Sequence, residues 1–219
     1  MHNSVKNLIS IQDNIKTNLS NLNINNKFKI IAVSKTFGID KILPLINFGH
    51  LDYGENKVQE AVDKWTKIKK ENSNLKLHMI GKLQRNKVKF AVSIFDYIHS
   101  VDSEKLAKKI LDESAKINKK IKIFIQVNIG EEGQKSGIDK SKLESLILYC
   151  KSIKLEIVGL MCIPPIDNEP AKYFKELEFL NIKYGFSELS MGMTSDYLEA
   201  IKSSATYVRI GSGIFGERI

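Results

Sequence analysis

Short apolar runs alternate along this chain with longer segments whose apolar residues recur at helical spacing. The runs are rich in β-branched residues, as buried strands are, and each is followed by a segment with an amphipathic period. We predict strands at 28–33, 51–53, 77–80, 97–101, 121–127, 156–160, 188–190 and 207–210. We predict helices between them at 41–48, 57–70, 84–92, 103–117, 141–152, 171–184 and 196–204.

A further helix is predicted before the first strand, because apolar residues recur there at helical spacing, at Val5, Leu8, Ile11, Ile15 and Leu19. Strands that alternate with helices and carry no hairpin signal form a parallel sheet. Eight such units predict an α/β protein, a (β/α)8 TIM barrel in which residues 1–219 form a single domain. An open doubly wound sheet is the alternative.

Two boundaries in this pattern rest on few residues. Ser141 and Glu144 have the spacing of a capping box, which predicts that Ser141 caps the helix that follows it. The seventh predicted strand, 188–190, is very short, and we expect the segment 191–196 to form the loop after it.

Charge and cysteine content change this picture little. Lys and Arg number 34 against 25 Asp and Glu, a net charge of +9, but the lysines are spread along the chain. Cys150 and Cys162 lack metal-ligand spacing, so we expect free thiols in a reducing compartment. No apolar run approaches the ~20 residues that cross a bilayer, and the first residues have no secretory pattern. We therefore expect a cytoplasmic protein with no membrane partner.

Candidate chemistry gathers at the predicted carboxyl ends of the strands, where such barrels carry their active sites. Lys35 follows the apolar run 30–33 almost at once. A lysine there either reaches water or is desolvated at the barrel mouth. Desolvation lowers the pKa of an amine, and the neutral amine forms an imine with an aldehyde.

The last two loops indicate an anion site. Thr194 and Ser212 offer hydroxyls, while Gly211 and Gly213 either turn a tight corner or let the backbone approach a phosphate. Arg209 lies inside the last strand, where it either holds a carboxylate or faces a ligand. An aldehyde that carries a phosphate and a ring nitrogen is pyridoxal phosphate, and these features together point to it.

Several stretches form a recognisable series: AVSKT (32–36), FGHLDYGENKVQE (48–60), HMIGKLQRNK (78–87), HSVDS (99–103), QVNIGEEGQKSGI (126–138), GLMCIPP (159–165), LSMGMTSD (189–196) and YVRIGSGIFGER (207–218). In this order, over nearly the whole chain, they resemble the pyridoxal phosphate homeostasis protein family. The resemblance implies a barrel similar to the N-terminal domain of alanine racemase.

The resemblance also implies a function and a site. The chain is expected to hold pyridoxal 5'-phosphate as a Schiff base on Lys35 and to take part in intracellular pyridoxal phosphate homeostasis. The other implied site residues are one near the cofactor, three at the phosphate and one at the pyridine nitrogen: Asn56; Thr194, Gly211 and Ser212; and Arg209. Two positions depart from the family, since Phe37 replaces a common second lysine and Lys82 replaces a usual histidine.

A carrier without strong catalytic activity is the expected role. An arginine at the ring nitrogen disfavours the protonated ring, which makes the cofactor a poorer electron sink. The alternative is an amino-acid racemase, which needs a second base. In alanine racemase that base comes from a C-terminal β domain, which we expect to be absent because the chain ends eight residues after Gly211. His78 or Tyr53 would have to substitute for it.

Nucleic-acid binding is a third hypothesis, motivated by the net charge and by the stretch KLQRNKVK (82–89). That stretch has no aromatic stacking platform. Leu83, Val88 and Phe90 fit a barrel helix with a solvated cationic face. We therefore expect no nucleic acid and no metal. We expect a monomer that binds a small-molecule cofactor and has pyridoxal phosphate-dependent apoenzymes as candidate partners.

Overall fold

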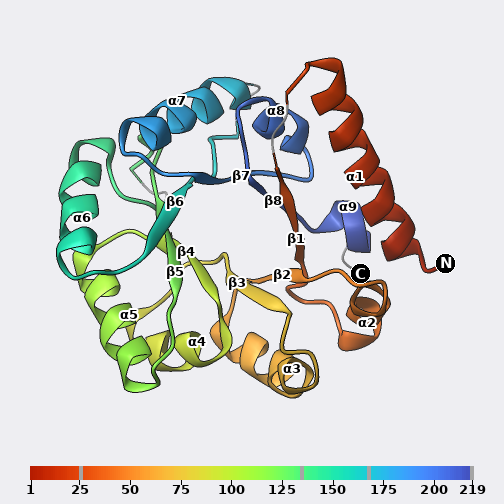
Figure 1. Ribbon diagram of the computed structural model, residues 1–219, viewed down its shortest axis with the longest axis horizontal. Coiled ribbons are helices and arrows are strands. Elements are labelled where there is room, and N and C mark those ends of the chain that lie inside the picture. The colour runs from red at the N-terminus through yellow and green to blue at the C-terminus, as the bar shows by residue number, and fades with distance from the viewer. Residues whose placement is uncertain (25–26, 134–135, 167–168, 218–219) are drawn as a thin grey trace.

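The computed structural model describes residues 1–24, 27–133, 136–166 and 169–217. Strands β1 to β8 are all parallel and form a closed barrel in chain order, with helices around it (Figure 1). The strands are β1 (Lys29–Val33), β2 (Asp52–Glu55), β3 (Lys76–Met79), β4 (Tyr97–Val101), β5 (Lys122–Gln126), β6 (Ile157–Met161), β7 (Glu188–Met193) and β8 (Tyr207–Ile210). The predicted (β/α)8 barrel is confirmed, and the open sheet is excluded because β1 pairs with β8, Ile31 opposite Arg209.

Helices follow the strands at close to the predicted positions. They are α2 (Ile39–Asn47), α3 (Val58–Glu71), α4 (Val88–Ile94) after a 3-10 turn at Arg85–Lys87, α5 (Glu104–Lys116), α6 (Lys140–Ser152), α7 (Pro170–Lys183), α8 (Tyr197–Lys202) and α9 (Ser212–Phe215). The short α9 was not predicted. The main apolar core fills the space between the barrel and these helices. That residues 1–219 form a single domain stays a prediction.

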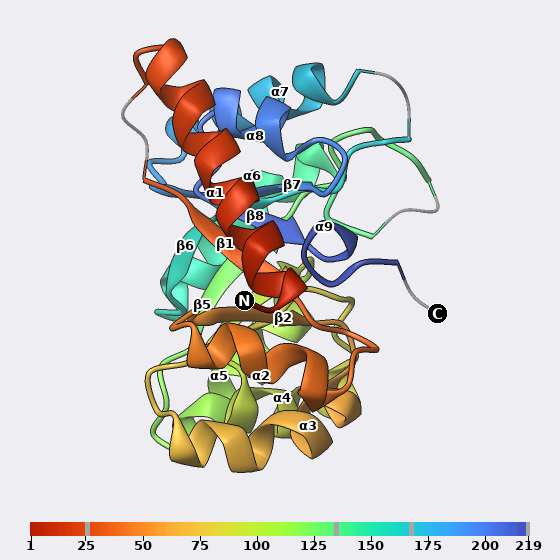
Figure 2. The same ribbon diagram turned by 90° about the vertical axis from the view of Figure 1, so that its right-hand side faces the viewer.

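The predicted N-terminal helix is confirmed as α1 (Asn3–Asn21), with its five predicted apolar positions buried. It lies outside the barrel between α8 and α2 and contacts α9 (Figure 2). The carboxamide of Asn7 donates to the backbone oxygen of Ile214, 3.0 Å away. The first helix is therefore tied to the segment that follows the last strand.

Two predicted boundaries are wrong. The helix expected to begin after Ser141 starts at Lys140, with extended Asp139 in the N-cap position, so Ser141 lies inside the first turn. Strand β7 runs three residues further than predicted, through Met193. Gly192 makes this possible, since its φ of +88° is one that L side chains rarely adopt, and a Cβ there would lie 2.5 Å from that of Ala200.

A smaller apolar cluster fills part of the barrel interior and comprises Ile31, Tyr97, Phe124, Met161 and Tyr207. Polar side chains share this interior with it, as described below. Within the described ranges, no helix is both long and apolar enough to cross a membrane. Leu83 and Val88 are buried, while Phe90 on α4 is half exposed.

Candidate functional site

A cavity of about 720 Å³, called here the mouth cavity, opens at the carboxyl ends of the strands. The residues predicted for the site come from the ends of β1, β2, β7 and β8, and all of them line this cavity: Lys35, Asn56, Thr194, Arg209, Gly211 and Ser212. The structure thus brings together a primary amine, a guanidinium, two hydroxyls and a glycine backbone. The apolar part of the wall includes Val33, Ile80 and Ile163.

The backbone beside Lys35 has an unusual conformation. Thr36 has a φ of +68°, which is uncommon for any residue except glycine and a genuine outlier for a β-branched one. Such a conformation costs on the order of 1–3 kcal/mol and persists only where neighbouring contacts enforce it. Lys35 itself is partly buried where this turn begins.

One set of contacts holds the residue before Lys35. Glu55 at the end of β2 is fully buried, and its Oε1 accepts hydrogen bonds from Ser34 Oγ at 2.8 Å, Trp65 Nε1 at 2.9 Å and Lys64 Nζ at 3.0 Å. Lys64 Nζ also donates to the backbone oxygen of Ser34 at 2.9 Å. Both the side chain and the backbone of Ser34 are therefore fixed from β2 and α3.

A second carboxylate holds the residue after Lys35. Glu60 on α3 accepts from the backbone N–H of Thr36 and lies 3.0 Å from Lys64 Nζ. Burial raises the pKa of Glu60, but the hydrogen bond from Thr36 and the charge of Lys64 outweigh burial, so the pKa lies below its usual value. We call Glu55, Glu60 and Lys64, with the two residues that they hold, the outer network.

Thr194 and the start of α9 form the opposite wall. Thr194 Oγ1 lies 3.4 Å from Ser212 Oγ and 3.4 Å from the backbone nitrogen of Gly213. A Cβ on Gly213 would meet Thr194 Cγ2 at 3.1 Å and Ile210 Cγ2 at 3.0 Å, closer than most real contacts. The glycine therefore lets two hydroxyls and a backbone N–H converge, which is the donor set that an anion needs.

Asn56 is positioned by a close backbone approach. A Cβ on Gly81, just after β3, would lie 2.5 Å from the backbone oxygen of Asn56. Any side chain at Gly81 would thus displace Asn56 from the cavity wall.

Arg209 is buried and lies with its guanidinium in the barrel interior. Its Nη1 donates to Ser190 Oγ and its Nη2 to the backbone oxygen of Cys162, each at 2.8 Å. Burial lowers its pKa. Within the described ranges no carboxylate forms an ion pair with it, and its expected role at a ligand stays a prediction.

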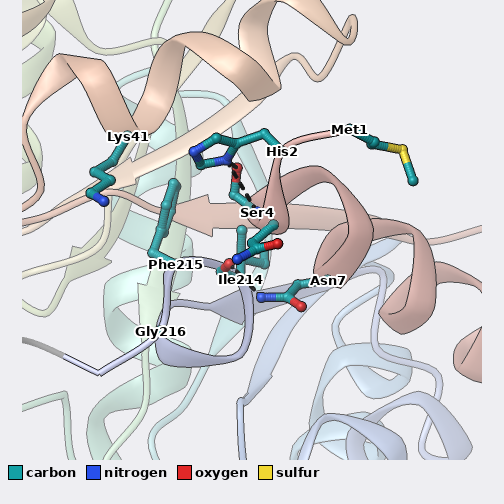
Figure 3. Close-up of a pocket in the computed structure, with 9 residues that line it drawn as sticks. Met1, His2, Ser4, Asn7, Lys41, Ile214, Phe215 and Gly216 are labelled. Atoms are coloured by element: carbon teal, nitrogen blue, oxygen red, sulfur yellow. Dashed lines mark hydrogen bonds between the residues drawn. The ribbon is translucent and has the colours of Figure 1, made fainter.

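A second cavity of about 410 Å³ adjoins the mouth cavity at Gly216 and lies against the first turns of α1 (Figure 3). The ring of Phe37 lines the mouth cavity and stacks on Phe215 of the second cavity, with centroids 4.9 Å apart. Figure 3 shows Asn7 pointing toward Ile214, and both residues line the second cavity. Phe37 and Phe215 therefore form an aromatic pair between the two cavities.

Neither candidate for a second base lies at the mouth. His78 is buried in the barrel interior against Asp52 and His99, and Tyr53 packs on Trp65 with ring centroids 4.8 Å apart. No tyrosine or histidine is among the described residues that line the mouth cavity. Lys82 is exposed and does not line the mouth cavity.

The two cysteines are free thiols. Cys150 and Cys162 are both buried, and burial raises the pKa of each to about 12. In the part of the chain that the structure describes, no cluster of His, Cys, Asp and Glu is suited to a metal ion.

The outer network was missed by reasoning from sequence. Glu55 and Asn56 are adjacent in the GEN stretch, and successive residues of a strand point to opposite faces. That alternation places Glu55 outside the barrel when Asn56 faces the mouth, a signal that was available. The partner Lys64 carries no such signal, because it depends on how α3 packs.

Comparison with known proteins places the chain in a defined group. Residues 7–219 match the family model described as alanine racemase, N-terminal domain. A pyridoxal phosphate homeostasis protein of Haemophilus influenzae is 36% identical over 97% of this chain and 94% of its own length. A protein of the same name from Escherichia coli is 32% identical over 100% of this chain and 98% of its own length.

A solved structure shows the same fold. PipY of Synechococcus elongatus, with PLP bound, superposes with a TM-score of 0.82 at 31% identity and covers 92% of this chain and 100% of its own.

Proposed function

This chain belongs to the family of pyridoxal phosphate homeostasis proteins, and we propose that it binds pyridoxal 5'-phosphate in the mouth cavity and takes part in homeostasis of that cofactor. The observation that carries the proposal is the meeting of Lys35, Arg209 and the Thr194–Ser212 pair around one cavity. The ligand has an aldehyde for Lys35, a ring nitrogen for Arg209 and a phosphate for the Thr194–Ser212 pair. PipY, a protein similar to this chain, has been solved with PLP bound.

Lys35 is proposed to hold the cofactor as a Schiff base. When bound, the cofactor supplies an aldehyde that condenses with a primary amine. The chain's part is to present that amine in one orientation, and the outer network does so by fixing Ser34 and Thr36 on either side of it. The outlying conformation of Thr36 is consistent with a backbone shaped for this purpose.

The other residues are proposed to orient the ligand. Thr194 Oγ1, Ser212 Oγ and the backbone of Gly211 at the start of α9 would bind the phosphate through neutral donors. Arg209 would face the ring nitrogen as a donor that cannot accept a proton, which keeps the nitrogen unprotonated. Asn56 would contact the cofactor from the end of β2.

We propose a carrier rather than an enzyme. The support is the set of residues at the mouth, which among those described includes no tyrosine or histidine to act as a second base. In this role the protein supplies cofactor to pyridoxal phosphate-dependent apoenzymes. The cytoplasmic location and the monomeric state stay predictions.

The binding proposal is tested by trapping the cofactor. Protein loaded with pyridoxal 5'-phosphate is reduced with borohydride and digested, and the modified lysine is identified by mass spectrometry. We expect the label on Lys35, its loss in Lys35→Ala and its retention in Lys41→Ala, a matched control at a lysine of α2 that lines the second cavity. Equal labelling of Lys35→Ala and the unaltered protein would contradict the assignment.

The carrier proposal is tested separately. The loaded protein is incubated with L-alanine or L-serine in deuterated water, and the α-proton is followed by NMR. We expect no exchange above the rate for free cofactor. Exchange at enzymatic rates would overturn the carrier role and support the racemase alternative.

A further inference from the structure

A line of polar side chains crosses the barrel interior from the mouth cavity to the opposite end. Arg209 Nη1 lies 2.8 Å from Ser190 Oγ, which lies 2.8 Å from His99 Nδ1. His99 Nε2 lies 2.9 Å from His78 Nδ1, and His78 Nε2 lies 3.0 Å from Asp52 Oδ1. We call these five residues, drawn from β8, β7, β4, β3 and β2, the inner chain.

The two ends of the inner chain fix the direction of every hydrogen bond in it. Arginine is only a donor and an ionised carboxylate is only an acceptor. Because Ser190 Oγ accepts from Arg209, its own hydrogen goes to His99 Nδ1. Each neutral ring that accepts at Nδ1 carries its hydrogen on Nε2, so His99 donates to His78 and His78 donates to Asp52.

The reverse direction is less favourable for two reasons. It needs a doubly protonated His78, and it leaves the Ser190 hydroxyl hydrogen without an acceptor among the described residues. Burial lowers the pKa of both rings, and the nearby Arg209 lowers that of His99 further. The other charged or titratable groups near the two rings are Lys29, His50, Asp96, Tyr97 and Tyr207.

The inner chain also explains how a buried cation is tolerated. A buried charge without a partner is costly, and no described carboxylate pairs with Arg209 directly. The charge of Asp196 favours the guanidinium through space, and Asp52 carries a second negative charge at the far end of the inner chain, where it borders a cavity of about 240 Å³ beside Lys29 and His50. Hydrogen bonds that all run one way polarise one another, so the carboxylate acts on the guanidinium through the rings.

We propose that Ser190, His99, His78 and Asp52 are positioning residues, which act as one unidirectional hydrogen-bond chain to hold the guanidinium of Arg209 at the inner wall of the mouth cavity. The consequence for ligand binding rests on the proposed function, in which Arg209 faces the ring nitrogen. The positioning itself is a property of the ligand-free protein and is measured there.

The first experiment uses ligand-free protein labelled with ¹⁵N. Ring-nitrogen spectra at pH 7.5 are expected to show His78 and His99 as neutral rings with the hydrogen on Nε2. A charged His78, or a hydrogen on Nδ1 of either ring, would overturn the stated direction.

The second experiment breaks the chain at Ser190. In Ser190→Ala we expect the guanidinium hydrogens of Arg209 to exchange with solvent about tenfold faster, as for the loss of a hydrogen bond to a charged group. Ser190→Thr keeps the hydroxyl and is expected to restore slow exchange. Phe124→Leu is the matched control, since Phe124 stacks on His99 with centroids 4.3 Å apart but forms no bond of the chain.

Ligand affinity completes the test. We expect Ser190→Ala to bind pyridoxal 5'-phosphate about tenfold more weakly and to shift its visible absorption band, with Phe124→Leu close to the unaltered protein. Unchanged Arg209 exchange in Ser190→Ala, or equal effects of Ser190→Ala and Phe124→Leu, would overturn the positioning role. If the unaltered protein binds no cofactor, the proposed function is wrong. The ring-nitrogen spectra and the exchange of the Arg209 hydrogens still show whether the inner chain positions Arg209.

Discussion

The backbone N–H of Thr36, in the turn after β1, donates to Glu60 Oε1 of helix α3. Thr36 has the outlying backbone conformation, and Glu60 is the carboxylate whose pKa is lowered. Lys35 directly precedes Thr36 in the chain. The shape of the turn that presents Lys35 is therefore maintained from outside the barrel, by a helix that contributes nothing to the mouth cavity itself.

Glu60→Ala is expected to loosen this turn. Loss of the hydrogen bond should lower the free energy of unfolding by about 1 kcal/mol, because the carboxylate is partly exposed and solvent screens it. Labelling of Lys35 by pyridoxal 5'-phosphate should slow by more than stability explains. The measurement is urea denaturation alongside stopped-flow absorbance. Labelling at an unchanged rate would show that Glu60 does not shape the turn.

Glu55→Ala is expected to be far more disruptive. Glu55 is fully buried, and its removal leaves Lys64, whose side chain is only 11% exposed, without its buried partner. Breaking such a pair costs about 3–5 kcal/mol. Trp65 fluorescence during denaturation reports it directly, since Trp65 bonds to the same oxygen. Asp112→Ala is the control, because it breaks the exposed pair with Lys108 and should cost less than about 0.5 kcal/mol. Similar losses in the two variants would contradict the buried role of Glu55.

The two interior histidines predict how stability depends on pH. Burial lowers the pKa of His78 and His99 in the folded protein, so below about pH 6.5 the unfolded chain binds more protons than the folded one. The contribution of the two neutral histidines to the free energy of unfolding is complete above that pH, and it is lost as the pH falls toward their pKa values in the folded protein. We expect the free energy of unfolding to fall by about 1.4 kcal/mol per pH unit for each histidine in this range. Denaturant titrations between pH 7.5 and 5 measure it, and a flat profile would contradict buried neutral rings.

Phe37→Ala tests the wall between the two cavities. Its stack on Phe215 should be worth about 1 kcal/mol, so we expect bound pyridoxal 5'-phosphate to dissociate about fivefold faster. Release is followed by transfer to an excess of an acceptor apoenzyme. Phe90→Ala, at an exposed phenylalanine on α4, is the control and should leave release unchanged. No difference between the variants would show that the stack does not retain the ligand.

The sequence was enough to predict the barrel because short, mostly apolar segments alternate with longer segments of helical period, which is the pattern of a parallel sheet covered by helices. Lys35 and Arg209 could be placed near each other once a barrel was predicted, because closing the barrel in chain order makes the first and last strands neighbours. The end of strand β7 could not be predicted in this way, because the strand continues past residue 190 through the positive φ of Gly192 rather than through a run of apolar residues.

Side-chain partnerships were harder to predict. His78, His99 and Ser190 were all visible in strand segments, and strand alternation could have assigned them to the interior. Which of these side chains would form hydrogen bonds with one another was not predictable. That depends on the relative register of strands that are not all adjacent, and the register shifts between β4 and β5 and between β7 and β8. Lys64 is similar, since its two carboxylate partners meet only once α3 has packed on the barrel.

The pairing of β1 with β8 also sets when the protein can first work during its synthesis. Lys35 leaves the ribosome well before Arg209 and Ser212, which line the same cavity but lie more than 170 positions later in the sequence. The hydrogen bond between Asn7 and Ile214, 207 positions apart, likewise forms only after Ile214 has been made. A nascent chain thus carries the amine of Lys35 before Arg209 and Ser212 have been made, and the residues of the mouth cavity meet only when β8 pairs with β1 and the barrel closes.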